Sequence, residues 1–118
     1  MGLTCSSPPP FDEWEAKGVL DATNEGNWVG KAAKHVPVLV WMGGGKVSVS
    51  VPHGMEPDHW ITCIWIKDEA GKVLDYKLLK ASDGKATADF TVPVGTAITA
   101  FEKCNLHDVW KSSSMTVD

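Results

Sequence analysis

Four histidines and one cysteine are the side chains of this sequence that are best suited to bind a metal ion. Cys104 and His107 lie three residues apart, a spacing at which a tight turn directs a thiolate and an imidazole at one ion. His53 and His59 flank a short segment whose glycine and proline indicate bends. His35 supplies the fourth imidazole. By their types and spacing, these residues indicate a metal site.

The alternative for each histidine is an ordinary surface or core residue, which is the more frequent role of a single histidine. Four histidines at strand edges or in loops shift the balance towards a shared site. Structural zinc normally closes at four ligands, so a set of four imidazoles and one thiolate favours a redox metal. Imidazoles suit iron, copper or zinc, and a single thiolate donates electron density to an ion with an open position. Iron is therefore the favoured metal.

The elements that must position these ligands are β-strands. From residue 36 onward, β-rich runs alternate with turn residues, and no strand–helix–strand rhythm appears. This pattern predicts an all-β fold: an immunoglobulin-like antiparallel β-sandwich of about seven strands, with a short N-terminal helical or irregular segment. Strands are expected near residues 36–41, 46–52, 60–66, 73–79, 86–92 and 97–103.

Two of these runs also predict which residues are buried. Val47, Val49 and Val51 alternate with serines, so one face of this strand should pack while the other meets water. The run 60–66 is apolar on both faces, which predicts a central strand. Cys63 lies within this run and is expected to be a core thiol rather than a ligand.

The chain is expected to divide into residues 1–23, a tail with a possible short helix, and residues 24–118, the iron-binding sandwich. The first ten residues end in consecutive prolines, which favour an extended, solvated backbone. Apolar residues at near-helical spacing, with acidic residues in the first turn, predict a short helix within residues 11–20.

Composition limits the possible partners. The 118 residues suit one domain, and the net charge of −4 argues against a nucleic-acid surface, whose affinity comes from clustered basic residues. No apolar run is long enough to cross a bilayer, and residues 1–15 lack the order of a signal peptide. Three cysteines are an odd number, so at least one stays outside an internal disulfide. We therefore expect a cytoplasmic protein that binds neither nucleic acid nor membrane.

Three sequence blocks, in this order and spacing, resemble the signature of the superoxide reductase family, also called neelaredoxins. They are Lys34-His35-Val36-Pro37-Val38, the segment from His53 through Met55 to His59, and Cys104-Asn105-Leu106-His107 followed by Trp110. The resemblance covers roughly residues 24–111. It extends to the C-terminal domain of desulfoferrodoxin. Desulfoferrodoxin has an additional iron site in its N-terminal part, and that site needs four cysteines. Only Cys5 precedes the core here, so the chain resembles the one-iron type.

The resemblance implies roles for the site residues. In that family, an immunoglobulin-like sandwich binds one mononuclear non-haem Fe(2+/3+) through four histidines and one cysteine. The enzyme reduces superoxide to hydrogen peroxide by one electron, without dioxygen release. Lys34 corresponds to the family's catalytic lysine, which attracts the anion and orders the water that protonates the product. The implied ligands are His35, His53, His59, Cys104 and His107.

The resemblance also has one departure, and it implies partners. Many members carry a glutamate directly before the lysine as a sixth ligand of ferric iron, whereas this sequence has Ala33. We therefore expect a resting ferric site that is five-coordinate or takes water or hydroxide. An external electron donor such as rubredoxin or an NAD(P)H-dependent reductase is expected to re-reduce the iron. One-iron relatives are often tetramers, so a homo-oligomer is expected.

Two other functions agree with parts of the pattern. A cupredoxin, an electron-transfer copper protein, also combines a β-sandwich with a Cys-x-x-His loop. However, Met115 lies farther beyond His107 than an axial methionine usually does, and two of the other three histidines would be unused. In a non-catalytic sandwich used for adhesion or scaffolding, the histidines would be incidental.

Overall fold

The computed structural model describes residues 8–105 and 109–117 of the chain. Within these residues it has nine β-strands, two short α-helices and one 3-10 helix. The helices are α1 (Phe11–Ala16), α2 (Ala32–His35) and η1 (Ala81–Asp83). The strands are β1 (Val19–Leu20), β2 (Val38–Gly43), β3 (Lys46–Val51), β4 (Ile61–Asp68), β5 (Val73–Leu78), β6 (Ala86–Thr91), β7 (Ala97–Cys104), β8 (Val109–Lys111) and β9 (Met115–Thr116).

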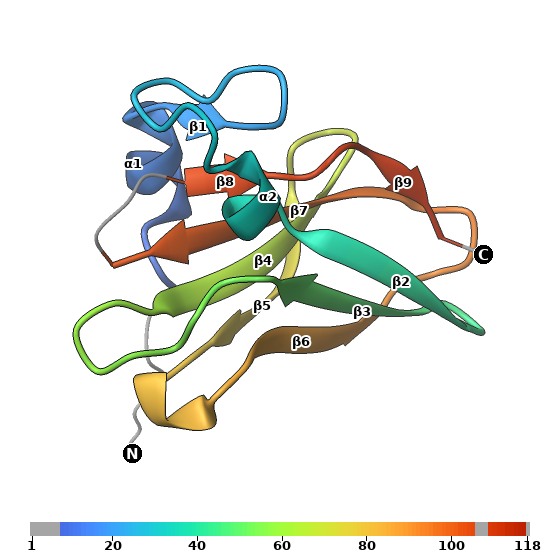
Figure 1. Cartoon of the computed structure of the whole chain (residues 1–118). Helices are drawn as coiled ribbons and strands as arrows, with labels where there is room; N and C mark the ends of the chain where they lie inside the picture. The colour runs from blue at the N-terminus through green and yellow to red at the C-terminus, as the bar shows by residue number, and fades with distance from the viewer. Residues whose placement is uncertain (1–7, 106–108, 118) are drawn as a thin grey trace, which may run out of the picture.

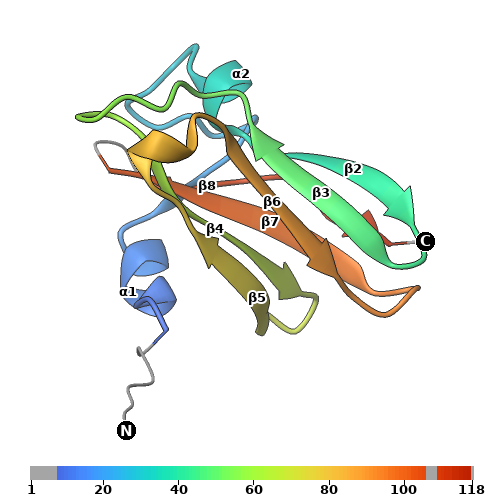
Figure 2. The ribbon, with the colours of Figure 1, turned by 90° about the horizontal axis from the view of Figure 1, so that it is seen from below.

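The strands form two sheets that face each other, as Figures 1 and 2 show. The larger sheet has the order β1-β8-β7-β4-β5, with β9 also paired to β7, and the smaller sheet has the order β2-β3-β6. The described pairings are antiparallel except for that of β1 with β8. The prediction of an immunoglobulin-like antiparallel sandwich is confirmed, with three short strands that the sequence did not indicate.

The main core lies between the two sheets. On β3, Val47, Val49 and Val51 are buried and the intervening serines are partly exposed, as their alternation predicts. Strand β4 pairs with β5 on one side and β7 on the other, so the apolar run is central as predicted. Each buried valine of this kind contributes roughly 1.5–3 kcal/mol to folding. This packing fixes the sandwich that positions the loops at its ends.

A second cluster covers the opposite face of the large sheet, where α1 packs. Phe11 lies 4.9 Å from the Trp65 ring, and Trp65 stacks on Phe101 at 5.6 Å. Cys63 is fully buried in this cluster, which confirms that it is a core thiol. Lys67 Nζ and a Glu15 carboxylate oxygen form an ion pair of 2.6 Å that adds a polar contact between α1 and β4.

The N-terminal helix is shorter than the predicted range. It ends at Ala16, and Gly18 follows with a φ of 115°, a conformation that glycine adopts without strain. Residues Val19–Leu20 then form β1 beside β8, and Leu20 is buried. Burial against β8 therefore determines the conformation of these two residues.

The prediction that His35 directly precedes a strand over residues 36–41 was wrong in its boundaries. Residues Ala32–His35 form α2, and the strand runs from Val38 to Gly43. Pro37 separates the two elements, because it has no backbone N–H to donate to a helix or sheet. Lys34 consequently lies on the helical turn α2 and not on a strand edge.

The topology collects the ends of three segments at one end of the sandwich. Strand β3 ends at Val51 and β4 begins at Ile61, so the loop between them crosses from one sheet to the other. Strand β7 ends beside the start of β4, with Ile61 opposite Cys104. In Figure 1, α2 lies at this same end.

Among the described residues, no helix is long and apolar enough to span a membrane.

Candidate metal centre

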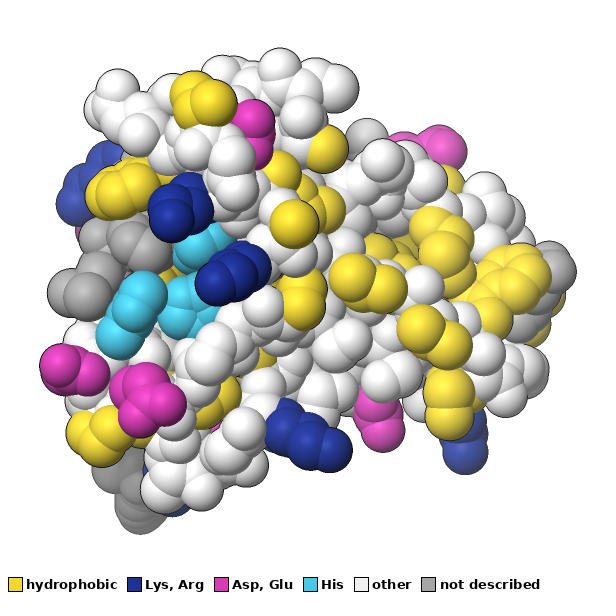
Figure 3. All heavy atoms as spheres, in the orientation of Figure 1, with side chains coloured by type: hydrophobic (Ala, Val, Ile, Leu, Met, Phe, Trp, Pro, Cys, Tyr) yellow, Lys and Arg dark blue, Asp and Glu magenta, His cyan; other side chains and the backbone are white. Residues whose placement is uncertain are grey.

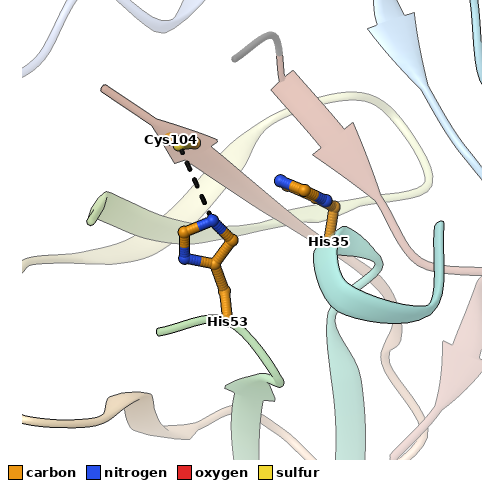
Figure 4. A group of neighbouring side chains, drawn as sticks. All are labelled: His35, His53 and Cys104. Carbon is orange, nitrogen blue, oxygen red and sulfur yellow. Dashed lines mark hydrogen bonds between the residues drawn. The ribbon is translucent and has the colours of Figure 1, made fainter. Parts of the chain in front are cut away.

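Three side chains from distant parts of the sequence meet at this end. His35 comes from α2, His53 from the loop after β3, and Cys104 from the end of β7, as Figure 4 shows. One ligand atom from each of the three lies within 4.8 Å of the other two. The sandwich therefore brings an imidazole pair and a thiol together across about 70 residues of sequence.

His59 joins this group through His53. Their Nε2 atoms lie 3.1 Å apart, and the rings are 4.4 Å apart at nearly a right angle. On the other side, His53 Nε2 lies 4.0 Å from Cys104 Sγ, the contact drawn as a dashed line in Figure 4. His53 is thus the central member of the described set.

Backbone carbonyls orient two of the imidazoles. His35 Nδ1 lies 2.9 Å from the Lys31 carbonyl, and His53 Nδ1 lies 2.6 Å from the Gly54 carbonyl. A carbonyl only accepts, so each Nδ1 carries the proton and each Nε2 carries the lone pair that binds metal. The His35 ring also stacks on buried Trp110 at a centroid distance of 5.2 Å, so this tryptophan packs beside the site.

The arrangement fits a divalent redox metal. Two ring nitrogens bound at about 2.1 Å and at right angles to one ion lie about 3.0 Å apart, close to the separation of His53 and His59. Burial lowers the pKa of His53, which favours the neutral imidazole that binds metal. Cys104 is fully buried, which suits a thiolate shielded from solvent. The donor set of imidazoles and one sulfur is of the kind that iron accepts.

His107, the fifth sequence-predicted ligand, lies outside the described residues. The described residues on either side of it are Asn105, which follows β7, and Val109, the first residue of β8. Its assignment as a ligand stays a prediction. Cys5 also lies outside the described residues.

One side of the candidate centre opens into a pocket of about 460 Å³. Figure 3 shows histidine side chains exposed there, with basic side chains on one side of them and acidic side chains on the other. Lys34 is exposed and belongs to the pocket wall, and Ala33 is exposed beside it. The lining residues are Trp28, Lys31, Lys34, His35, His53, Gly54, Glu56 and His59.

Two polar residues support the ligand segments and were given no role from the sequence. Asn105 hydrogen-bonds the backbone on both sides of His59. Glu25 Oε2 accepts hydrogen bonds from the amides of Gly30 and Ala32, at 3.0 and 3.1 Å, and so fixes the turn before α2. In the sequence, Asn105 appears only as part of the Cys-Asn-x-His order, and Glu25 only as a carboxylate ten residues before His35. Neither pattern indicates these contacts.

A buried carboxyl group lies close to the centre in the fold. Glu102 is fully buried, shares a face of β7 with Cys104, and pairs in register with Trp110. Within the described residues, both Glu102 carboxyl oxygens and Trp110 Nε1 lack a hydrogen-bond partner. Burial raises the pKa of Glu102 well above its ordinary value, so this side chain favours the neutral acid.

Comparison with known protein families identifies relatives over most of the β region. The family model described as Desulfoferrodoxin matches residues 27–113. The desulfoferrodoxin of Nitratidesulfovibrio vulgaris is 41% identical over 92 residues, which are 76% of this chain and 70% of that protein.

Solved structures agree with the fold. The superoxide reductase (neelaredoxin) from Ignicoccus hospitalis, in a variant form, superposes with a TM-score of 0.65 at 23% identity, over 87% of this chain and 97% of that chain. A variant of the superoxide reductase (neelaredoxin) from Archaeoglobus fulgidus, in the reduced form, gives a TM-score of 0.57 at 28% identity, over 75% of this chain and 91% of that chain.

Proposed function

The chain belongs to the desulfoferrodoxin family, and on that premise we propose that it is a superoxide reductase. The proposed reaction is O2•− + e− + 2H+ → H2O2, without release of dioxygen. The observation that carries the proposal is the approach of donor atoms from His35, His53 and Cys104 to within 4.8 Å of one another beside an open pocket. The family match gives no support to the copper protein that a Cys-x-x-His spacing also allowed.

We propose that one mononuclear non-haem iron is held by the three described histidines, Cys104 and His107. Bound there, iron would supply the single electron that superoxide accepts. The protein's contribution is the donor set and its orientation. The carbonyls of Lys31 and Gly54 hold the lone pairs of His35 and His53 towards the centre, as their short Nδ1 contacts support.

Lys34 is proposed to act on the substrate side. Its ammonium group is exposed on the pocket wall, where a positive charge attracts a small anion and Nζ–H groups donate to an oxygen atom. The two protons that the product needs reach it from solvent through this pocket, with a water ordered at Lys34 Nζ. Cys104 is fully buried and is not among the described residues that line the pocket.

Two residues that precede Lys34 support the proposal that this segment supplies no ligand. Ala33 has no ligand atom, and the Glu25 carboxylate accepts hydrogen bonds from two backbone amides. We therefore propose that the resting ferric centre is five-coordinate or takes water or hydroxide, as Ala33 led us to expect.

Partners of the enzyme follow the same premise. An external donor, rubredoxin or an NAD(P)H-dependent reductase, is proposed to return the electron, and a cytoplasmic location is proposed. A homo-oligomer such as a tetramer is supported by the exposed apolar side chains of β2, an edge strand. These are Val38, Val40, Trp41 and Met42.

The experiment that tests this function measures iron content and superoxide consumption together. We expect about one iron per chain, and hydrogen peroxide formed without dioxygen release, which distinguishes a reductase from a dismutase. Cys104→Ser should abolish the reaction and weaken iron binding, so that its iron content falls below that of the unsubstituted protein. The matched control is Cys63→Ala, which changes a buried thiol of the other cluster and should retain both. Dioxygen release in stoichiometric amounts would contradict the proposal.

A further inference from the structure

Two lysines, rather than one, border the pocket of the candidate metal centre. Lys31 and Lys34 are both exposed and both line it. The Lys34 amide donates a hydrogen bond of 3.1 Å to the Lys31 carbonyl, so the two side chains are one helical turn apart and lie on the same side of the turn. Figure 3 shows basic side chains beside the exposed histidines.

The sign of the local charge depends on Lys31. Among the described residues that line the pocket, the charged side chains are Lys31, Lys34 and Glu56. The charges of Lys34 and Glu56 offset each other, so Lys31 gives these three side chains a net charge of +1. The chain as a whole carries a net charge of −4, which repels a small anion at long range. Removing Lys31 would therefore leave these lining side chains without a net positive charge and weaken their attraction for anions.

The backbone of Lys31 is held on both sides. Glu25 Oε2 accepts hydrogen bonds from the amides of Gly30 and Ala32, the two neighbours of Lys31. The Lys31 carbonyl in turn contacts His35 Nδ1 at 2.9 Å. The negative charge of Glu25 is directed at backbone amides, and the lysine is anchored next to the centre. A side-chain substitution at position 31 leaves all of these backbone contacts in place.

From this arrangement we propose that Lys31 steers small anions, superoxide among them, into the metal pocket. The inference rests on the proposed function for its substrate, but the steering itself needs only the pocket and its charge. Lys31 acts through the local potential and does not have to contact the substrate. Its effect is therefore on the rate of encounter, and added salt screens it.

A first test uses fluorescence quenching of Trp28, which lines the same pocket. Iodide serves as the anionic quencher and acrylamide as the neutral one, and Trp28→Phe identifies the Trp28 contribution. At low ionic strength, Lys31→Ala should lower the iodide quenching of Trp28 about threefold, the effect of one unit charge several ångströms away in water, and leave acrylamide quenching unchanged. Equal iodide quenching in both proteins would overturn the proposal, whether or not the protein reduces superoxide.

The matched control is Lys46→Ala. Lys46 is exposed at the start of β3, and His53 follows the other end of that strand, roughly 17 Å away for a six-residue strand. At this distance in water, one unit charge changes the local concentration of an anion by no more than about 1.5-fold, even with little screening by salt. Iodide quenching of Trp28 should therefore change far less in this variant than in Lys31→Ala.

A second test measures the second-order rate constant for superoxide reduction against ionic strength. Lys31→Ala should lower the rate constant about threefold at roughly 10 mM salt, and the difference should disappear near ~0.5 M. Lys31→Arg should keep the rate constant, and Lys31→Glu should lower it further. An unchanged salt dependence in Lys31→Ala would overturn the proposal. Iodide steering without superoxide reduction would instead contradict the proposed function and leave the steering role of Lys31 in place.

Discussion

The side-chain amide of Asn105 donates a hydrogen bond of 3.0 Å to the carbonyl of Asp58. Asn105 Oδ1 also accepts a hydrogen bond from the backbone amide of Trp60 at 2.8 Å. The backbone amide of Asn105 donates to the Trp60 carbonyl at 3.0 Å. These three bonds bracket His59 and attach its segment to the residue that follows Cys104. The protein thus links two ligand-bearing segments through its own hydrogen bonds.

Asn105→Ala should loosen this attachment. The substitution removes the side-chain bonds to Asp58 and Trp60, and each is worth about 0.5–1.5 kcal/mol of stability. Because His59 would be held less firmly, metal affinity should fall roughly 10–100-fold, the usual cost of losing a supporting contact. Metal titration and thermal unfolding measure the two effects. Asn27→Ala replaces an exposed asparagine and should change neither metal affinity nor thermal stability. Unchanged metal affinity in Asn105→Ala would contradict the supporting role of Asn105.

Glu102→Gln should make the metal-free protein less sensitive to pH. Burial raises the pKa of Glu102, so its contribution to stability is complete below the ordinary carboxyl pKa and is lost as pH rises above it. The free energy of unfolding should therefore fall with rising pH by up to about 1.4 kcal/mol per unit, and Glu102→Gln should remove that fall. Denaturant unfolding between pH 5 and pH 8 measures it. Exposed Glu69→Gln is the control, and parallel pH profiles for Glu102→Gln and the unsubstituted protein would refute the assignment.

Cys63 should resist alkylation while the protein is folded. Burial raises the pKa of this thiol to about 12, so almost no reactive thiolate exists at pH 8. Iodoacetamide followed by peptide mass spectrometry should find Cys63 unmodified in the native protein and modified after denaturation. Cys63→Ala identifies the peptide, and rapid labelling of native Cys63 would show that the cluster under α1 opens readily.

Phe11→Ala should separate stability from the metal site. Phe11 is buried against Trp65 on the face of the large sheet that α1 covers, so truncation should cost about 3 kcal/mol. The inter-sheet core and the ligand segments do not include Phe11, so metal affinity should be retained at temperatures where the variant is folded. The control Leu78→Ala removes an exposed side chain and should change stability by less than about 0.5 kcal/mol. Lost metal affinity in folded Phe11→Ala would show that α1 supports the site.

The longer strands could be predicted from the sequence because their side chains alternate or are continuously apolar. Val47, Val49 and Val51 specify which face of β3 is buried, and the run through Cys63 specifies a central strand. The short strands β1, β8 and β9 have two or three residues each, and their conformation depends on pairing with a neighbour that no local pattern reveals.

The candidate ligands could be selected by residue type and spacing, but their supports could not. The carbonyl that orients His35 belongs to Lys31, a backbone group that every residue has. Asn105 and Glu25 act through contacts with backbone atoms of segments folded against them, and sequence separation does not encode such contacts. The helical turn at α2 has only four residues, too few for a periodic signal.

Iron K-edge X-ray absorption on the iron-loaded protein tests most directly whether histidines and Cys104 converge on one metal. We expect one sulfur neighbour together with several imidazole nitrogens. The sulfur signal should be lost from the iron that Cys104→Ser still binds and kept in Cys63→Ala. A first shell of nitrogen and oxygen alone in the unsubstituted protein would contradict that convergence.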